Sequence, residues 1–347
     1  MAPTLDIVRK AVEPLADMRL TFRHLPAGAE HYARTGAAFP AESMDAARAA
    51  DAILLSAMGL PSVRYADGTE ISPQLDLRGA LNLFAGVRPV VIFPGLRSPL
   101  SAEQSDSVDF VLVRESTEGL FASHGKGQLI DDREARETMV ITRQTSEKLF
   151  DFAFELAQQR RQAGRGPGTV TCVDKANVFQ AFAFFRKIFF ERARRHPDLT
   201  ANTAYVDATA LWMVQKPWEF DVLVTENMFG DILSDLGSAL MGGLGIAPSA
   251  DIGDDHAVFQ PCHGSAPDIA GKNMANPLAM ILSAAMMLDW LGRRRNHAGL
   301  QAAGARIDAA VRAVFTDTDV RTADLGGNAS TTQMADAVID RMKGLAP

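Results

Sequence analysis

The chain has 347 residues, with 35 Lys or Arg against 42 Asp or Glu, so its formal net charge at neutral pH is −7. An acidic chain is poorly suited to wrapping DNA or RNA, and no nucleic-acid partner is expected. Cys172 and Cys262 cannot form a disulfide framework, no signal-type segment opens the chain, and the longest apolar run, 278–288, is too short to span a membrane. We expect a cytoplasmic protein of two domains, or one large α/β body.

The chain opens directly on a helical pattern, with apolar residues at Leu5, Val8, Ala11 and Leu15. Short β-branched runs then alternate with amphipathic helices, which predicts an α/β fold. The predicted strands are Ala52–Ser56, Pro89–Phe93, Phe110–Val113, Thr138–Ile141, Thr169–Val173, Tyr205–Val206 and Val222–Thr225. The predicted helices are Ser146–Arg161, Val178–Arg194 and Leu278–Trp290, the last apolar on almost every side and therefore buried or at a subunit interface. Basic clusters at 160–161, 192–195 and 293–295 are interpreted as solvated helix ends.

Two aspartates follow the strand that ends at Thr225. Asp231 and Asp235 are four residues apart, so on a helix they share one face. Like charges at this spacing repel, and a hard divalent cation such as Mg²⁺ would offset the repulsion. The pair therefore predicts a metal site, against the alternative of two solvated aspartates. The usual Gly-x-Gly-x-x-Gly, P-loop and His-Glu-x-x-His motifs are absent from the sequence.

Other segments suggest chemistry around this pair. Lys175 ends a predicted strand, where active-site groups commonly lie, and a lysine there can act as a base. Arg78, Arg88 and Arg114 have the planar fork that grips carboxylates, although each could equally sit in a structural ion pair. The small residues of the 263–271 loop allow a ligand to approach the backbone closely.

Taken together, the blocks Asn227–Ser249 and His263–Gly271 resemble the β-decarboxylating dehydrogenases, a family that includes 3-isopropylmalate, isocitrate, homoisocitrate, tartrate and D-malate dehydrogenases. The resemblance runs from about residue 45 to 290. It implies an α/β fold of two domains, with mixed sheets flanked by helices and a cofactor site that is not of the Rossmann type. Residues 1–83 and 242–347 would form the cofactor domain, and residues 84–241 the substrate, metal and dimerisation domain.

The resemblance also implies an activity and its residues. Such enzymes oxidise a malate-type 2-hydroxy acid with NAD and Mg²⁺ or Mn²⁺, release CO₂ and protonate the resulting enol. The implied metal ligands are Asp231 and Asp235 of one subunit and Asp207 of the other, and the implied base is Lys175, also from the other subunit. Arg78, Arg88 and Arg114 would hold the substrate carboxylates. The catalytic unit would be a homodimer with shared sites.

The implied cofactor residues are His263, Gly264, Ser265, Ala266, Asp268, Ile269 and Asn276. Asp268 and Ile269 match positions that meet the 2′ side of the ribose. A carboxylate there accepts a hydrogen bond from a hydroxyl but repels a phosphate, so NAD is expected rather than NADP.

Three departures from the family pattern qualify these expectations. Phe121 replaces the usual tyrosine proton donor, so we expect water or a neighbour such as His124 to protonate the enol. Ser72 and Gln74 replace pocket leucines of isopropylmalate enzymes, which favours a carboxylate, hydroxyl or hydrogen at C3, unless these side chains point into solvent. The family's opening strand does not precede the first helix; a late start codon is expected rather than a lost strand.

The resulting prediction is a dehydrogenase for a malate, tartrate or isocitrate-like acid. The alternatives are a 3-isopropylmalate dehydrogenase or a non-catalytic regulatory subunit of the same family.

Overall fold

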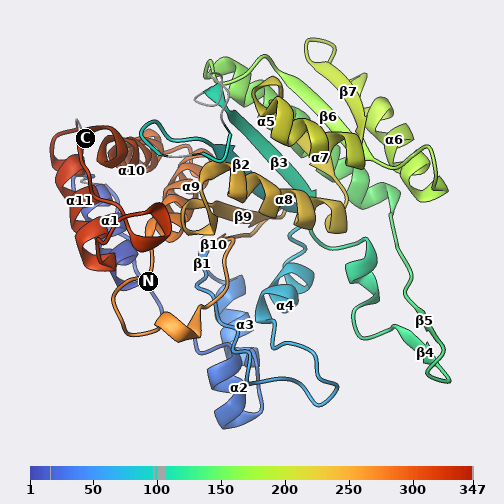
Figure 1. Cartoon of the computed structure of the whole chain (residues 1–347), viewed down its shortest axis with the longest axis horizontal. Helices are drawn as coiled ribbons and strands as arrows, with labels where there is room; N and C mark the ends of the chain where they lie inside the picture. Colours follow the sequence, from blue (N-terminus) through green and yellow to red (C-terminus); the bar gives the residue numbers. More distant parts are fainter. Residues whose placement is uncertain (16, 97, 101–106, 346–347) are drawn as a thin grey trace.

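One mixed sheet organises the molecule. In a computed structural model, which describes residues 1–15, 17–96, 98–100 and 107–345, an eight-stranded sheet has the order β1-β10-β9-β2-β3-β8-β6-β7. Its strands are β1 (Ile53–Leu54), β2 (Ala85–Val91), β3 (Asp109–Glu115), β6 (Thr169–Asp174), β7 (Thr200–Tyr205), β8 (Val222–Thr225), β9 (Pro248–Ile252) and β10 (Ala257–Pro261). β3, β8, β6 and β7 run parallel, whereas β2 is antiparallel to both β3 and β9. A hairpin of β4 (Gln128–Ile130) and β5 (Glu134–Arg136) extends away from this body (Figure 1).

The helices cover the sheet in groups. They are α1 (Ala2–Val12), α2 (Ala29–Thr35), α3 (Ala41–Arg48), α4 (Pro73–Ala80), α5 (Arg143–Gln162), α6 (Gln180–Ala193), α7 (Val206–Gln215), α8 (Asn227–Met241), α9 (Leu278–Arg294), α10 (Ala298–Asp317) and α11 (Thr331–Lys343). α5 packs on α6, and α7 packs on α8. α1, α9, α10 and α11 pack on one another, and this group contains the first and the last helix of the described chain (Figure 1). Among the described residues, no helix has the length and hydropathy needed to cross a bilayer.

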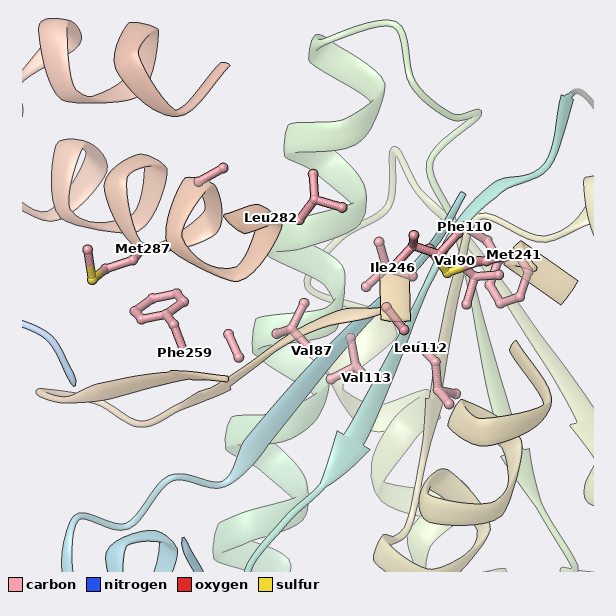
Figure 2. Packing of buried hydrophobic residues seen from close by; sticks show 14 of the residues in the cluster. Val87, Val90, Phe110, Leu112, Val113, Met241, Ile246, Phe259, Leu282 and Met287 are labelled. Atoms are coloured by element: carbon pink, nitrogen blue, oxygen red, sulfur yellow. The ribbon is translucent and has the colours of Figure 1, made fainter. Parts of the chain in front are cut away.

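The main hydrophobic core is continuous across the sheet. Val87 and Val113 from the central strands, Phe259 from β10 and Leu282 from α9 belong to the same buried cluster (Figure 2). Residues 110–113 of β3 form an apolar run, because both α5 and α8 pack on this strand. Arg88 of β2 and Arg114 of β3 interrupt the apolar pattern of the central strands. Only three residue pairs join β9 to β2, and this junction falls between the two domains expected from the sequence. The division into two domains stays a prediction.

The predicted α/β fold is confirmed, with local corrections. α1, α5, α6 and α9 match the predicted helices, and α9 is largely buried. Thr138–Ile141 is not a strand: only Val140 forms a bridge, to Gly119, because Thr142 caps α5 immediately afterwards. β7 ends at Tyr205, and Val206 already begins α7. Arg160 is not solvated; it is buried in ion pairs with Asp109 and Asp221.

Candidate functional site

Strand register brings an acidic and two basic residues onto one face of the sheet. Gly86 of β2 lies opposite Arg114 of β3 on one side and Asp251 of β9 on the other. Residues directly opposite one another point to the same face, and Arg88, two positions after Gly86, points there too. A Cβ atom at position 86 would lie 3.2 Å from Asp251 Oδ1 and 2.6 Å from Ser116 Oγ. The glycine therefore leaves the space that this group of side chains fills.

Arg78 joins the group from α4. Its Nε donates to Asp251 Oδ2 at 3.1 Å, and Arg88 Nη2 donates to Asp251 Oδ1 at 3.0 Å. Arg88 Nη1 also donates to the carbonyl of Ala250 at 3.0 Å. The sequence left substrate binding and structural ion pairing open for these arginines, and the structure places both in ion pairs with one buried aspartate.

The charges in this group shift one another's proton affinity. Burial alone would raise the pKa of Asp251, but Arg78 and Arg88 outweigh it and lower that pKa to about 2. Burial, together with the nearby positive charge of Arg78, lowers the pKa of Arg114 to about 10. Arg114 is thus a buried cation whose charge is only partly offset by its neighbours.

The side-chain amide of Asn227, on α8, holds the guanidinium of Arg114, which projects from β3. Asn227 Oδ1 accepts from Arg114 Nε at 2.9 Å and from Nη2 at 2.7 Å, while Asn227 Nδ2 donates to the carbonyl of Glu118 at 2.9 Å. Arg114 Nη1 donates to Asp231. A Cβ on Gly230 would come within 2.6 Å of Arg114, so this glycine lets α8 pack closely on β3. Asn227 therefore fixes both the arginine and the loop beside it.

Asp231 and Asp235 lie on the helix α8, as the sequence predicts, and both side chains are exposed. Burial, and then the charge of Asp231, raises the pKa of Asp235. The N-cap of α8 is Glu226, a buried carboxylate that accepts from Phe229 N at 2.7 Å and Met228 N at 3.1 Å. α8 thus presents two repelling carboxylates from a firmly capped helix.

Lys175 and Asp207 lie together at the far strands. Lys175 directly follows β6, Asp207 is in the first turn of α7, and Lys175 Nζ donates to Asp207 Oδ1 at 2.5 Å. This hydrogen bond lowers the pKa of Asp207. Among the described residues of the single chain, no three acidic, His or Cys side chains form a group that could hold a metal. Asp207 is therefore not brought to Asp231 and Asp235 within one chain.

Asp174, the residue before Lys175, is held by an ion pair. Asp174 is fully buried and accepts from Arg186 Nε at 2.8 Å and Nη2 at 2.7 Å. The Arg186 guanidinium lies over the ring of Tyr205, 5.1 Å from its centroid. This arrangement fixes the end of β6 from which Lys175 projects.

The aromatic ring of Phe121 lies beside Arg114. The guanidinium carbon is 5.2 Å from the ring centroid, a cation–π distance, so the ring position is compatible with a place in the same site. His124, the alternative proton donor, is exposed and directly follows the 3₁₀ helix Leu120–Ser123, which contains Phe121.

The two predicted specificity residues lie at the start of α4. Ser72 is the N-cap residue, and its hydroxyl donates to the carbonyl of Glu70 at 3.2 Å. Gln74 and Leu75 precede Arg78 by four and three residues, so both lie on the helix face of Arg78. The side chains of Gln74 and Leu75 are half-buried rather than open to solvent. The surface of α4 beside Arg78 is therefore part polar and part apolar.

The predicted cofactor loop is tied to the body at both ends. Ser265 Oγ donates to the carbonyl of Gly59, and Asn276 Nδ2 donates to Asp324 at 3.0 Å. Asn276 Oδ1 also accepts from Leu278 N at 3.0 Å, so its amide is used in the chain itself. His263 Nδ1 lies 2.8 Å from the carbonyl of Gly264, Asp268 and Ile269 form a short 3₁₀ turn, and Ala266 has a positive φ. The loop is preformed, and Gly264 has open space around it.

Sequence reasoning missed Asp251, Asn227 and Glu226, and also Gln260 of β10, whose Nε2 donates to Asp251 Oδ2 at 2.8 Å. The signal for Asp251 was an acidic residue inside the otherwise small and apolar run 247–252, since a carboxylate is rarely buried unless it is paired.

The mixed sheet and α4 thus carry three buried arginines beside two aspartates on α8. A family model described as isocitrate/isopropylmalate dehydrogenase matches residues 1–338. The chain belongs to the isocitrate/isopropylmalate dehydrogenase family.

Named relatives cover nearly the whole chain. It is 40% identical to the 3-isopropylmalate/3-methylmalate dehydrogenase of Methanocaldococcus jannaschii over 341 residues, which cover 97% of this chain and 95% of that protein. It is 43% identical to the 3-isopropylmalate dehydrogenase of Listeria monocytogenes, with 88% and 84% covered. Among solved structures, the isocitrate dehydrogenase of Methylococcus capsulatus superposes with a TM-score of 0.82 at 38% identity, with 99% of this chain and 96% of that one covered.

Proposed function

We propose that this chain catalyses the NAD-dependent oxidative decarboxylation of a 3-substituted malate, with 3-isopropylmalate as the leading substrate. The observation that carries the proposal is the buried group of Arg78, Arg88 and Arg114 beside the carboxylates of α8. The substrate is argued from the relatives, whose names favour 3-isopropylmalate. They give no support to D-malate or tartrate, which the sequence had favoured.

The metal-binding prediction agrees with the chemistry of α8. Asp231 and Asp235 are two exposed carboxylates one turn apart; burial raises the pKa of Asp235 most, and the charge of Asp231 adds a repulsion that a divalent cation would relieve. Mg²⁺ or Mn²⁺ is usually bound by a few carboxylates plus substrate and water oxygens. Asp231, Asp235 and Asp207 of a second copy would hold it.

The 263–276 loop would bind NAD. Gly264 and Ala266 leave the backbone accessible, and the exposed carboxylate of Asp268 would accept from a ribose hydroxyl and repel a 2′-phosphate. When bound, the cation polarises the C2 oxygen of the substrate and NAD⁺ accepts the hydride from C2.

The chain's own residues then have distinct tasks. Arg78, Arg88 and Arg114 orient the substrate carboxylates through charge-assisted hydrogen bonds. Lys175 of the second copy takes the proton of the C2 hydroxyl. The carboxylate on C3 leaves as CO₂, its bonding electrons form the enolate, and water or His124 returns a proton to C3 because Phe121 has none to give.

Exposed apolar residues on α7 and α8 support a homodimer with shared sites. Asp207, Leu211 and Val214 are spaced on one face of α7, and Ile232 lies beside Asp231 on α8. Leu211, Val214 and Ile232 are each about half exposed or more, at 53%, 49% and 63%. A two-fold contact over this face would bring Asp207 and Lys175 of one copy toward Asp231 and Asp235 of the other.

A second candidate substrate class rests on α4. The half-buried amide of Gln74 beside Arg78 would favour a polar group at C3, as in tartrate or isocitrate. The test is the kcat/KM of the purified chain, with NAD and Mn²⁺, for 3-isopropylmalate, 3-methylmalate, D-malate, tartrate and isocitrate. The proposal expects the highest value for 3-isopropylmalate; a value at least tenfold higher for tartrate or isocitrate would replace it with the second candidate.

A further inference from the structure

The arginine group contains its own counter-ion. The Asp251 carboxylate is buried, and its Oδ2 accepts from Arg78 Nε at 3.1 Å and from Gln260 Nε2 at 2.8 Å, while Oδ1 accepts from Arg88 Nη2 at 3.0 Å. Both oxygens are thus used inside the chain. Asp251 belongs to the wall of the site and is not one of the groups left to grip a ligand.

Neighbouring strands hold this carboxylate in place. Asp251 pairs with Gly86 on β2 and with Val258 on β10. Its partner Gln260 is fixed in turn, because the Gln260 carbonyl accepts from Ser249 Oγ at 2.7 Å and from Ser283 Oγ at 2.9 Å. The position of the negative charge is therefore set by the sheet, with little freedom to move away when a ligand arrives.

The charge count of the site follows. Three arginines contribute three positive charges, and Asp251 offsets one of them permanently, because its low pKa keeps it ionised at any working pH. Arg114 is further paired with Asp231. In the described part of the chain, the two terminal nitrogens of Arg78 have no hydrogen-bond partner and remain for a ligand carboxylate.

We propose that Asp251 is a specificity-determining positioning residue. It holds Arg78 and Arg88 side by side and cancels one of their charges, so the site prefers a dicarboxylate with an uncharged group at C3 over a tricarboxylate. The inference rests on the proposed function only for the identity of the site. Asp251 would discriminate substrates such as an alkylmalate from substrates that carry a third carboxylate. The residues of α4 alone do not make this distinction.

The test measures binding without turnover. Succinate and propane-1,2,3-tricarboxylate are titrated calorimetrically, without metal or NAD, into the wild-type chain and into Asp251→Asn. We expect the tricarboxylate to bind wild type no more than about twofold tighter than succinate, and the ratio to rise about tenfold in Asp251→Asn, because one unit charge is removed from a weakly screened site. Asp251→Glu, which keeps the charge, should retain a ratio near that of wild type.

A second buried aspartate provides the control. Asp221 is paired with Arg160 Nε at 2.7 Å at a separate place in the sheet, so Asp221→Asn also removes a buried ion pair but should leave the ratio unchanged. The inference is overturned if wild type already binds the tricarboxylate tenfold more tightly than succinate, or if the ratio in folded Asp251→Asn equals that of wild type. If Asp251→Asn does not fold, the wild-type ratio alone decides. Because no turnover is measured, a chain that oxidises no malate but shows the expected ratios would refute the proposed function and not this inference.

Discussion

At the residue scale, the sequence identified the cations of the site better than their partners. Arg78, Arg88 and Arg114 were recognisable from their local settings, and all three are buried around one point. Asp251 was not, because its role depends on β9 pairing with β2, a contact between segments more than 160 residues apart. Strand order of this kind is a property of the whole sheet, and no local pattern encodes it.

Glu115, beside Arg114, gives a pH-dependent prediction. Burial raises its pKa to about 7 from an ordinary value of 4.5, although Thr117 and Glu118 donate hydrogen bonds to it. The folded state therefore holds this proton more tightly than the unfolded state. The contribution to stability is full below about pH 4.5 and is lost as the pH rises through about 7, a total of about 3 kcal/mol.

Urea unfolding between pH 4.5 and 7.5 tests whether the free energy of unfolding falls as the pH rises. Glu115→Gln should remove most of the loss, so the free energy of unfolding of wild type should fall by about 3 kcal/mol more than that of the variant over this range. Equal slopes for the two proteins would show that Glu115 does not change its proton affinity on folding.

At the scale of elements, three long helices and the strands β3, β6 and β8 were predicted, whereas α10, β9 and β10 were not. α5, α6 and α9 follow from apolar periodicity. β9 was missed because four of its five residues are Pro, Ser, Ala and Asp, which have low strand propensity and reach the sheet only through pairing. The strand predicted at Thr138–Ile141 does not form for the opposite reason: its β-branched residues have no strand to pair with beyond Gly119.

α8 should depend on its cap. Glu226→Ala removes the acceptor for Met228 N and Phe229 N, and is expected to lower the free energy of unfolding by about 1–2 kcal/mol. Because α8 carries Asp231 and Asp235, the affinity for Mn²⁺, measured by electron paramagnetic resonance, should weaken as well. Glu226→Gln keeps an acceptor oxygen and should recover most of both losses; equal losses in the two variants would contradict the capping role.

At the scale of the molecule, the positions of Lys175 and Asp207 underlie the proposal of a site shared between two copies. They lie with β6 and α7, whereas Asp231 and Asp235 lie on α8 with a different set of partners. Their predicted meeting requires a second copy, and the exposed apolar residues of α7 and α8 give such a contact a driving force.

Mixing inactive variants tests the shared site. Lys175→Ala and Asp231→Asn should each lack activity, but after subunit exchange at equal amounts half of the dimers are mixed and each has one intact site of two. Activity should therefore recover to about a quarter of the wild-type value. Differently tagged chains show whether the subunits exchange. If they exchange and the mixture remains inactive, both residues belong to the same site of one chain.

The central claim is that this chain oxidises and decarboxylates its substrate, and product stoichiometry tests it most directly. NADH and CO₂ should form in equal amounts from 3-isopropylmalate in the presence of NAD and Mn²⁺, and removal of the metal with EDTA should abolish both. The account would be contradicted if a folded chain that binds Mn²⁺ and NAD formed no NADH from 3-isopropylmalate or from any other malate tested. The chain would then be a non-catalytic member of the family.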